Sequence, residues 1–134
     1  MAITVPKSIL LVDNDRGVLA ALTARLGGMG YRCESACSGA QALSLFKLHG
    51  ADLIISDLNM PQGDGETLAE NIRRVSDVPM IIISGFKDAP RKKLVGIPGV
   101  RFLEKPFEGS VLAELVGATL AEPVAEQGDV RRPA

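Results

Sequence analysis

Four short apolar runs of the chain end in polar side chains that could handle a phosphoryl group. The runs end in Asp13-Asn14-Asp15, Ser56-Asp57, Ser84-Gly85 and Glu104-Lys105-Pro106. Each group alone is weak evidence, because Asp and Ser commonly begin turns and cap helices. Together they supply carboxylates, a hydroxyl group and a cation, which are the groups needed to transfer a phosphoryl group to a carboxylate.

Within this set, Asp57 is the candidate nucleophile. A hard cation with oxygen ligands, best Mg²⁺, would bridge Asp57 to the incoming phosphoryl oxygens and reduce the repulsion between the anions. Lys105 is long enough to place its charge on another phosphoryl oxygen, and the hydroxyl group of Ser84 can donate to a third. A structural interpretation also exists, in which Lys105 only neutralises a cluster of carboxylates. These residues alone leave both interpretations open.

A repeated pattern of strands and helices must position these residues. Apolar runs short enough to be strands buried on both faces of a parallel sheet lie at residues 9–12, 53–55, 80–83 and 100–104. Residues 31–36 form a more polar run, which suits the edge of a sheet. Between the runs, helical spacing predicts these inward side chains: Val18, Leu19, Leu22, Leu26; Leu43, Phe46; Leu68, Ile72, Val75; and, in residues 110–121, Val111, Leu112, Leu115, Val116, Leu120.

Helix boundaries can also be read from the residues. Asp15 and Ser38 are the expected N-caps of the first two helices. The first helix is expected to end in the glycines that follow it, Gly27, Gly28 and Gly30. Pro90 could begin a short fourth helix, which the glycines and the proline of residues 96–99 would end by about residue 95.

Five βα units with right-handed crossovers predict an α/β fold, a doubly wound three-layer αβα sandwich around a five-stranded parallel sheet. Strand order 2-1-3-4-5 is one of the two common solutions. In that order the first, third and fourth strands are neighbours, and ligands bind outside the carboxyl ends of such strands. We therefore expect one pocket surrounded by Asp13, Asp57, Ser84 and Lys105.

Composition narrows the classes of function. With 134 residues, of which 46% are hydrophobic and 23% charged, the chain resembles a single globular domain. Its 15 Lys and Arg against 16 Asp and Glu lack the basic surplus of a nucleic-acid-binding protein. No apolar run approaches the roughly 18 to 20 residues that span a bilayer, and the N-terminus lacks the features of a signal peptide. We expect a cytoplasmic protein whose partners are neither nucleic acids nor membranes.

The two cysteines and the single histidine are expected to be structural. Cys33 and Cys37 lie four residues apart with no second Cys or His pair that would complete a zinc site. We expect both to be reduced, partly buried small hydrophobic residues. His49 precedes Gly50 at the expected end of a helix, where a cation or a hydrogen-bond donor suits the helix dipole.

The segments around the strand ends also match a known pattern. They are Ile9-Leu10-Leu11-Val12-Asp13-Asn14-Asp15, Asp52-Leu53-Ile54-Ile55-Ser56-Asp57-Leu58-Asn59-Met60-Pro61 with Gly65, Ser84-Gly85, and Phe102-Leu103-Glu104-Lys105-Pro106-Phe107. Over residues 8 to about 121 the chain resembles the receiver domains of two-component response regulators. The resemblance implies a flavodoxin-like sheet of order 2-1-3-4-5 and a receiver domain in residues 1–121. Residues 122–134 are expected to form a flexible tail or to begin a linker.

The resemblance implies a role in phosphorelay signal transduction. Asp57 would accept the phosphoryl group from a phosphohistidine of a sensor histidine kinase or a histidine phosphotransfer protein. Asp13 and Asp57 would bind Mg²⁺, and Asn59 would contribute its backbone carbonyl. The protein would take part in its own phosphorylation and dephosphorylation, but it would not be an enzyme that turns over an external substrate.

The resemblance also implies a conformational switch. Ser84 matches the switch hydroxyl residue, and Phe102 matches the aromatic residue that turns inward behind it, so that phosphorylation changes the face that an output partner binds. Lys105 matches the lysine of the site, and its bond to Pro106 is expected to be cis.

Asn14 is the main departure from the family pattern, which usually has a second acidic residue at this position. An amide oxygen can still be a metal ligand but brings no charge, so Mg²⁺ binding is expected to be weaker. Asp15 is expected to cap the following helix and not to replace the missing acid. The alternative function is a pseudo-receiver, an interaction module whose phosphorylation is weakened or absent because of Asn14.

Two other classes on the same fold are less favoured. A phosphatase with an aspartyl nucleophile would need an acid two residues after it, where Asn59 stands. A flavodoxin-like cofactor binder would need a glycine loop for phosphate after the first strand, and the sequence has none there.

Phe86, two residues after Ser84, is expected to slow dephosphorylation, and residues 91–93 are expected to form a basic turn in contact with solvent.

Overall fold

The computed structural model describes residues 5–60, 65–85, 94 and 96–121. All neighbouring strands are parallel, and the sheet has the order β2-β1-β3-β4-β5. The strands are β1 (Ser8–Val12), β2 (Arg32–Ala36), β3 (Leu53–Asp57), β4 (Met80–Ser84) and β5 (Val100–Glu104). The α/β fold and the strand order 2-1-3-4-5 that the sequence predicts are therefore confirmed.

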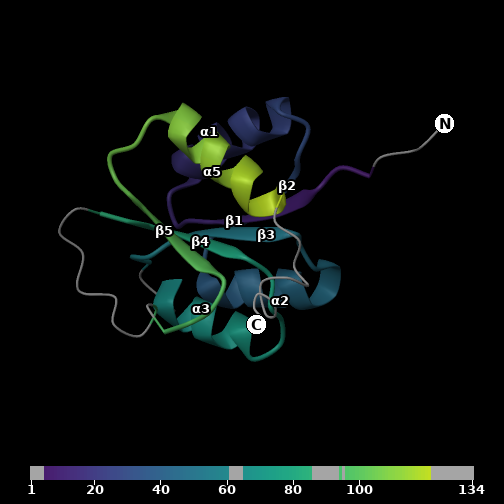
Figure 1. Ribbon diagram of the computed structural model, residues 1–134. Coiled ribbons are helices and arrows are strands. Elements are labelled where there is room, and N and C mark those ends of the chain that lie inside the picture. The colour runs from purple at the N-terminus through teal and green to yellow at the C-terminus, as the bar shows by residue number, and fades with distance from the viewer. Residues whose placement is uncertain (1–4, 61–64, 86–93, 95, 122–134) are drawn as a thin grey trace.

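Helices cover both faces of the sheet (Figure 1). On one face lie α1 (Arg16–Gly28) and α5 (Gly109–Ala121), and on the other lie α2 (Gly39–His49) and α3 (Gly65–Arg73). The expected fourth helix, Phe86 and the basic residues 91–93 lie outside the residues that the structure describes. None of the helices in the described ranges is long and apolar enough to cross a bilayer.

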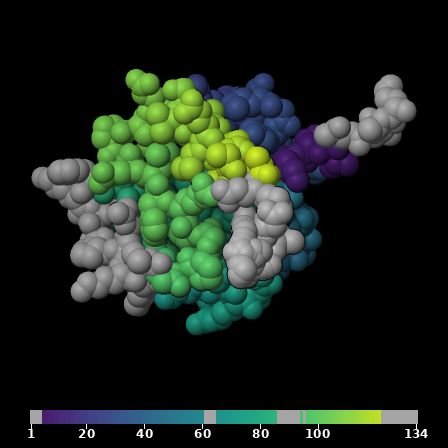
Figure 2. Space-filling model, in the orientation of Figure 1, coloured from purple at the N-terminus to yellow at the C-terminus, as the bar shows by residue number. Residues whose placement is uncertain are grey.

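Alternating strand residues divide the core into two parts, because successive side chains of a strand point to opposite faces of the sheet. Leu10, Ile54 and Ile82 belong to the cluster that packs against α2 and α3. Their neighbours, among them Ile9 and Ile55, belong to the cluster that packs against α1 and α5. In β1, β3 and β4 nearly every residue is buried, so these strands read as continuous apolar runs. From the side shown in Figure 2 the visible surface is formed mainly by helices and by the edge strand β5.

The polar run of residues 31–36 is confirmed as the edge strand β2, which pairs only with β1 among the described strands. Its burial falls accordingly: only Ala36 is fully buried. Cys33 and Cys37 are both free and partly buried, and they pack against the α1 and α5 side of the core. Burial raises the pKa of the Cys33 thiol, because a thiolate would lose hydration there. The expectation of reduced, partly buried cysteines is confirmed.

The expected helix caps are present. The carboxylate of Asp15 accepts hydrogen bonds from the backbone N–H groups of Gly17 and Val18, at 2.8 and 3.2 Å. The hydroxyl oxygen of Ser38 accepts from the N–H of Gln41 at 3.1 Å. Each bond satisfies a donor that has no partner in the first helical turn.

Some inward positions were predicted wrongly. Val75 is 53% exposed because α3 already ends at Arg73, so the helical spacing does not extend to it. Val111 is 44% exposed in the first turn of α5, and the inward positions of that helix include Thr119 instead. The buried hydroxyl group of Thr119 donates to the carbonyl of Leu115 at 2.7 Å, which makes the polar residue tolerable there.

The first helix ends among the glycines expected to end it: Gly27 and Gly28 are its last two residues, and Gly30 follows it.

Candidate functional site

Three polar residues are buried at the carboxyl ends of neighbouring strands. Asp13 follows β1, Asp57 ends β3 and Ser84 ends β4. These residues are 5%, 7% and 0% exposed, respectively. The register sets Val12 opposite Ser56 and Asp57 opposite Ile83. Asp13 directly follows Val12, and Ser84 directly follows Ile83, so both lie next to the end of β3. The sheet brings these three residues to one edge.

Lys105 reaches this edge from the turn that follows β5. Its Nζ lies 3.4 Å from Oδ1 of Asp57, although β4 lies between the two strands. Its backbone N–H donates to the carbonyl of Ser84 at 2.8 Å, and its bond to Pro106 is cis. The Lys105 side chain is 46% exposed, against 9% for Asp57. The cation can therefore meet a group that arrives from solvent while it stays close to the buried carboxylate.

The residues after β1 have different environments. Oδ1 of Asp13 accepts a hydrogen bond from the N–H of Asp15 at 2.8 Å, which orients the buried carboxylate. The carboxylate of Asp15 caps α1, so it is not available to replace a missing acid. Asn14 and Asn59 are both exposed beside the site.

Ser84 and Phe102 lie on the same face of the sheet. Phe102 in β5 is opposite Ile82 in β4, and Ser84 is two residues beyond Ile82. Because side chains alternate along a strand, Ile82, Ser84 and Phe102 point to the same side. Phe102 is partly buried and packs against the core on the α2 and α3 side. The two predicted switch residues are thus in position to influence one another.

The charges of the site favour a cation. The carboxylates of Asp13 and Asp57 are buried at this end of the sheet, and Lys105 contacts Asp57, so the formal charge of the three is −1 at neutral pH. In the described part of the chain no three His, Cys, Asp or Glu side chains gather as a metal site. Asn14 stands where the resemblance implies a second acidic residue next to Asp13, so an oxygen donor is present there but without a charge.

Two further residues, Ser56 and Gly65, contact the backbone of Asp57 and Leu58; from the sequence they were only parts of a strand end and of the family motif, with no role of their own. The buried hydroxyl group of Ser56 donates to the carbonyl oxygen of Asp57 at 3.0 Å. The N–H of Gly65, at the start of α3, donates to the carbonyl of Leu58 at 2.9 Å. A serine inside an otherwise apolar buried strand is the sequence signal that points to Ser56, because buried hydroxyl groups need a partner.

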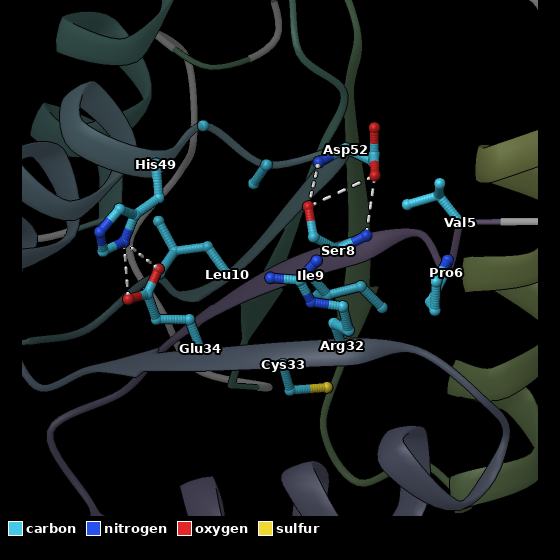
Figure 3. Close-up of a pocket in the computed structure, with 12 residues that line it drawn as sticks. Val5, Pro6, Ser8, Ile9, Leu10, Arg32, Cys33, Glu34, His49 and Asp52 are labelled. Atoms are coloured by element: carbon cyan, nitrogen blue, oxygen red, sulfur yellow. Dashed lines mark hydrogen bonds and ion pairs between the residues drawn. The ribbon is translucent and has the colours of Figure 1, made fainter.

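The opposite edge of the sheet has a cavity of about 490 Å³, whose lining is shown in Figure 3. Its carboxylates bind neighbouring side chains and backbone: Asp52 accepts from the N–H of Ser8 at 2.7 Å, and Glu34 lies 3.0 Å from Nδ1 of His49. Gly50 caps α2 directly after His49. These contacts join α2 to the edge strand β2 and β1 to the start of β3, so the groups stabilise the fold. His49 is the last residue of α2, as expected, and its ring contacts Glu34 of the edge strand.

Comparisons with known proteins agree with this geometry. Residues 9–117 match the family described as "Response regulator receiver domain". The chain is 35% identical over 119 residues to the transcriptional regulatory protein GlrR of Escherichia coli strain K12, a match that covers 87% of this chain and 27% of GlrR. It is 34% identical over 113 residues to the sensor kinase CckA of Brucella abortus, a match that covers 81% of this chain and 12% of CckA.

Solved structures show the same fold. The signal receiver domain of an HD domain-containing protein from Pseudomonas fluorescens Pf-5 superposes with a TM-score of 0.80 at 29% identity. That match covers 87% of this chain and 95% of the solved chain. By contrast, the chain spans less than half the length of the curated relatives it matches first. The residues at the strand ends, the strand order and these matches agree: the chain belongs to the response regulator receiver domain family of two-component signalling proteins.

Proposed function

We propose that this receiver accepts a phosphoryl group on Asp57 from the phosphohistidine of a sensor histidine kinase or a histidine phosphotransfer protein. The observation that supports this most directly is the contact between Nζ of Lys105 and Oδ1 of Asp57, at 3.4 Å, at an edge where Asp13 and Ser84 are also buried. Lys105 could be a structural partner alone. Because the Lys105 side chain is 46% exposed, however, solvent screens the ion pair, which then contributes only about 0 to 1 kcal/mol to stability and gives a weak reason to keep Asp57 buried.

The proposed step is an in-line displacement at phosphorus. A carboxylate oxygen of Asp57 forms the new bond to phosphorus while the bond from phosphorus to the imidazole nitrogen breaks. The imidazole keeps the electron pair of that bond and leaves as the neutral ring after it takes up a proton. Lys105 lies where it can neutralise one phosphoryl oxygen, and the hydroxyl group of Ser84 can donate to another. The product is an acyl phosphate on Asp57.

The residues of the site fit Mg²⁺. Asp13 and Asp57 are buried carboxylates at one edge of the sheet, and their combined charge exceeds that of Lys105. Asn14 and the backbone carbonyl of Asn59 are the further oxygen donors that would complete the set. When bound, Mg²⁺ supplies charge that reduces repulsion between the carboxylate and the phosphoryl oxygens. Since Asn14 brings no charge, the receiver is expected to need more Mg²⁺ than a relative with an acid there.

We further propose that the switch is formed by Ser84 and Phe102. Movement of the Ser84 hydroxyl group toward the phosphoryl group would leave space on the face of β4 that Phe102 shares. The surface around β5 then changes, and an output partner responds. In this proposal the chain is a phosphoacceptor that takes part in its own phosphorylation and dephosphorylation, and it does not turn over an external substrate.

The experiment uses phosphoramidate, a small donor with a phosphorus–nitrogen bond, together with Mg²⁺. Intact-mass spectrometry is expected to show one added phosphoryl group on the wild type and none on Asp57→Ala. NMR with Mg²⁺ and beryllofluoride is expected to shift the amide signals of Ser84, Phe102 and Lys105 in the wild type alone. A wild type that gains no phosphoryl group and shows no shifts would overturn the proposal.

Asn14 specifically favours a second candidate, the pseudo-receiver, which signals without phosphorylation. The same NMR experiment separates the two. In a pseudo-receiver, beryllofluoride leaves the spectra of both the wild type and Asp57→Ala unchanged at every Mg²⁺ concentration, whereas a weakened phosphoacceptor responds in the wild type once Mg²⁺ is raised.

A further inference from the structure

We propose that Ser56 and Gly65 are positioning residues that fix the backbone carbonyl of Asp57 and thereby aim its carboxylate. This inference rests on the proposed function, because it concerns how accurately the phosphoacceptor is presented. Neither residue touches the reacting atoms. Both act through the peptide unit that joins Asp57 to Leu58.

The hydroxyl group of Ser56 holds this peptide unit from within the sheet. Ser56 is fully buried in β3, a strand whose other residues before Asp57 are Leu53, Ile54 and Ile55. Its Oγ lies 3.0 Å from the carbonyl oxygen of Asp57 and donates to it. A buried hydroxyl group in an apolar layer is stable only with such a partner.

On the side of α3, Gly65 packs directly against the backbone of Asp57 and Leu58. A Cβ atom on Gly65 would lie 2.5 Å from the carbonyl oxygen of Asp57 and 2.9 Å from Cα of Leu58. Both are backbone atoms and cannot rotate away as a flexible side chain would. A side chain at this position would therefore have to displace the backbone, so space alone favours a glycine here. The N–H of Gly65 also donates to the carbonyl of Leu58, which fixes α3 at this distance.

Together these contacts restrict rotation of the peptide after Asp57. The N–H of Leu58 donates to the carbonyl of Ile83 in the neighbouring strand β4, at 2.7 Å. Both the carbonyl and the N–H of the peptide between Asp57 and Leu58 are therefore held. The Asp57 side chain starts from this fixed backbone and ends 3.4 Å from Nζ of Lys105. A reacting group displaced by about 1 Å can lose about 100-fold in rate, so even a small rotation of this peptide is costly.

The test compares Ser56→Ala and Gly65→Ala with matched controls. Thr119→Val also removes a buried hydroxyl group that donates to a backbone carbonyl, but it does so in α5. Gly117→Ala also adds a methyl group to a helical glycine, but into open space. Phosphorylation by phosphoramidate is measured at saturating Mg²⁺ and donor, and the rates are corrected for the folded fraction from circular dichroism.

Ser56→Ala is expected to lower the corrected rate about 3- to 10-fold and Gly65→Ala about 10-fold or more. Both controls are expected to stay within about 2-fold of the wild type. If Gly65→Ala does not fold, Ser56→Ala decides alone, because it only removes one oxygen atom. Equal corrected rates for Ser56→Ala and Thr119→Val would overturn the inference, since a purely structural hydroxyl group would give that result.

A second readout keeps this inference separate from the proposed function. The ¹³C shift of the Asp57 backbone carbonyl and the χ1 couplings of Asp57 report its orientation without any phosphorylation. They are expected to change in Ser56→Ala and to stay unchanged in Thr119→Val. Unchanged values in Ser56→Ala would overturn the inference. A wild type that is never phosphorylated, with these changes still present, would overturn the proposed function alone.

Discussion

Single residues determine the charge at the carboxyl ends of the strands, and Asn14 is the position where one substitution would add a carboxylate next to Asp13. It is exposed between the buried carboxylate of Asp13 and the helix cap Asp15. Because Asp15 is already engaged with the start of α1, no neighbour in this turn compensates for the missing charge. The affinity for a divalent cation is therefore expected to depend on this one position.

We predict that Asn14→Asp lowers the Mg²⁺ concentration for half-maximal phosphorylation about 10-fold, because a third carboxylate adds charge to the ligand set. The measurement is a Mg²⁺ titration of phosphoramidate-driven phosphorylation, with amide shifts of the Mg²⁺-bound protein as a second readout. Asn71→Asp, a similar change on α3, is the control and should leave the titration unchanged. An unaltered Mg²⁺ requirement in Asn14→Asp would contradict the account.

Lys105 allows function to be separated from stability. We predict that Lys105→Met lowers the phosphorylation rate about 100-fold, because a cation aimed at a developing charge is lost. Its free energy of unfolding should change by less than about 1 kcal/mol, because the Lys105 side chain is 46% exposed and solvent screens its ion pair with Asp57. The measurements are the phosphorylation rate and urea unfolding followed by circular dichroism. A large loss of stability with a normal rate would instead favour the structural interpretation of this lysine.

At the level of elements, glycines in a helix and in a turn have very different surroundings. Gly117 lies within α5, and a Cβ atom there would meet nothing within 4 Å. Gly99, in the turn before β5, has a φ of +75°, and a Cβ atom there would lie 3.2 Å from Nη2 of Arg73. The same substitution should therefore have opposite effects at the two positions.

We predict that Gly117→Ala raises the free energy of unfolding by about 0.5 to 1 kcal/mol, because alanine restricts the unfolded chain and favours the helix. Gly99→Ala should lower it by about 1 kcal/mol or more, because an L-residue rarely adopts this φ. Urea unfolding of both variants checks the signs. Two changes of the same sign would contradict the prediction.

At the scale of the whole molecule, Arg73 joins segments that are distant in sequence. From the end of α3 it donates to the carbonyls of Ser76 and Val78, at 2.9 and 2.8 Å, and to that of Pro98 at 3.0 Å. The turn before β4 is thereby tied to the turn before β5. Burial lowers the pKa of Arg73, and the nearby carboxylate of Asp77 opposes this change.

We predict that Arg73→Met lowers the free energy of unfolding by about 2 to 4 kcal/mol, because three carbonyl groups lose a charged donor. Arg74→Met is the matched control, since the side chain of this exposed neighbour bonds only to Asn71 among the described residues. It should change stability by less than about 0.5 kcal/mol. The measurement is urea unfolding, and equal effects of the two substitutions would rule out this role for Arg73.

Much of this molecule could be predicted from the sequence because the deciding interactions are local. Alternating strands and helices follow from the period of the apolar residues, and the caps at Asp15 and Ser38 act within one turn. The order of the sheet and the shared edge of Asp13, Asp57, Ser84 and Lys105 then follow from right-handed crossovers and from the family resemblance. The role of each residue in phosphorylation stays a prediction.

Only the tertiary structure decided which distant atoms meet. No local pattern indicates that Arg73 reaches Pro98, that α3 begins against the carbonyl of Asp57, or that Val75 and Val111 face solvent. These features depend on where a helix ends and how closely it packs on the sheet, which the whole core determines. The sequence by itself thus determined the elements and the set of reactive residues, whereas packing between elements decided how accurately that set is held.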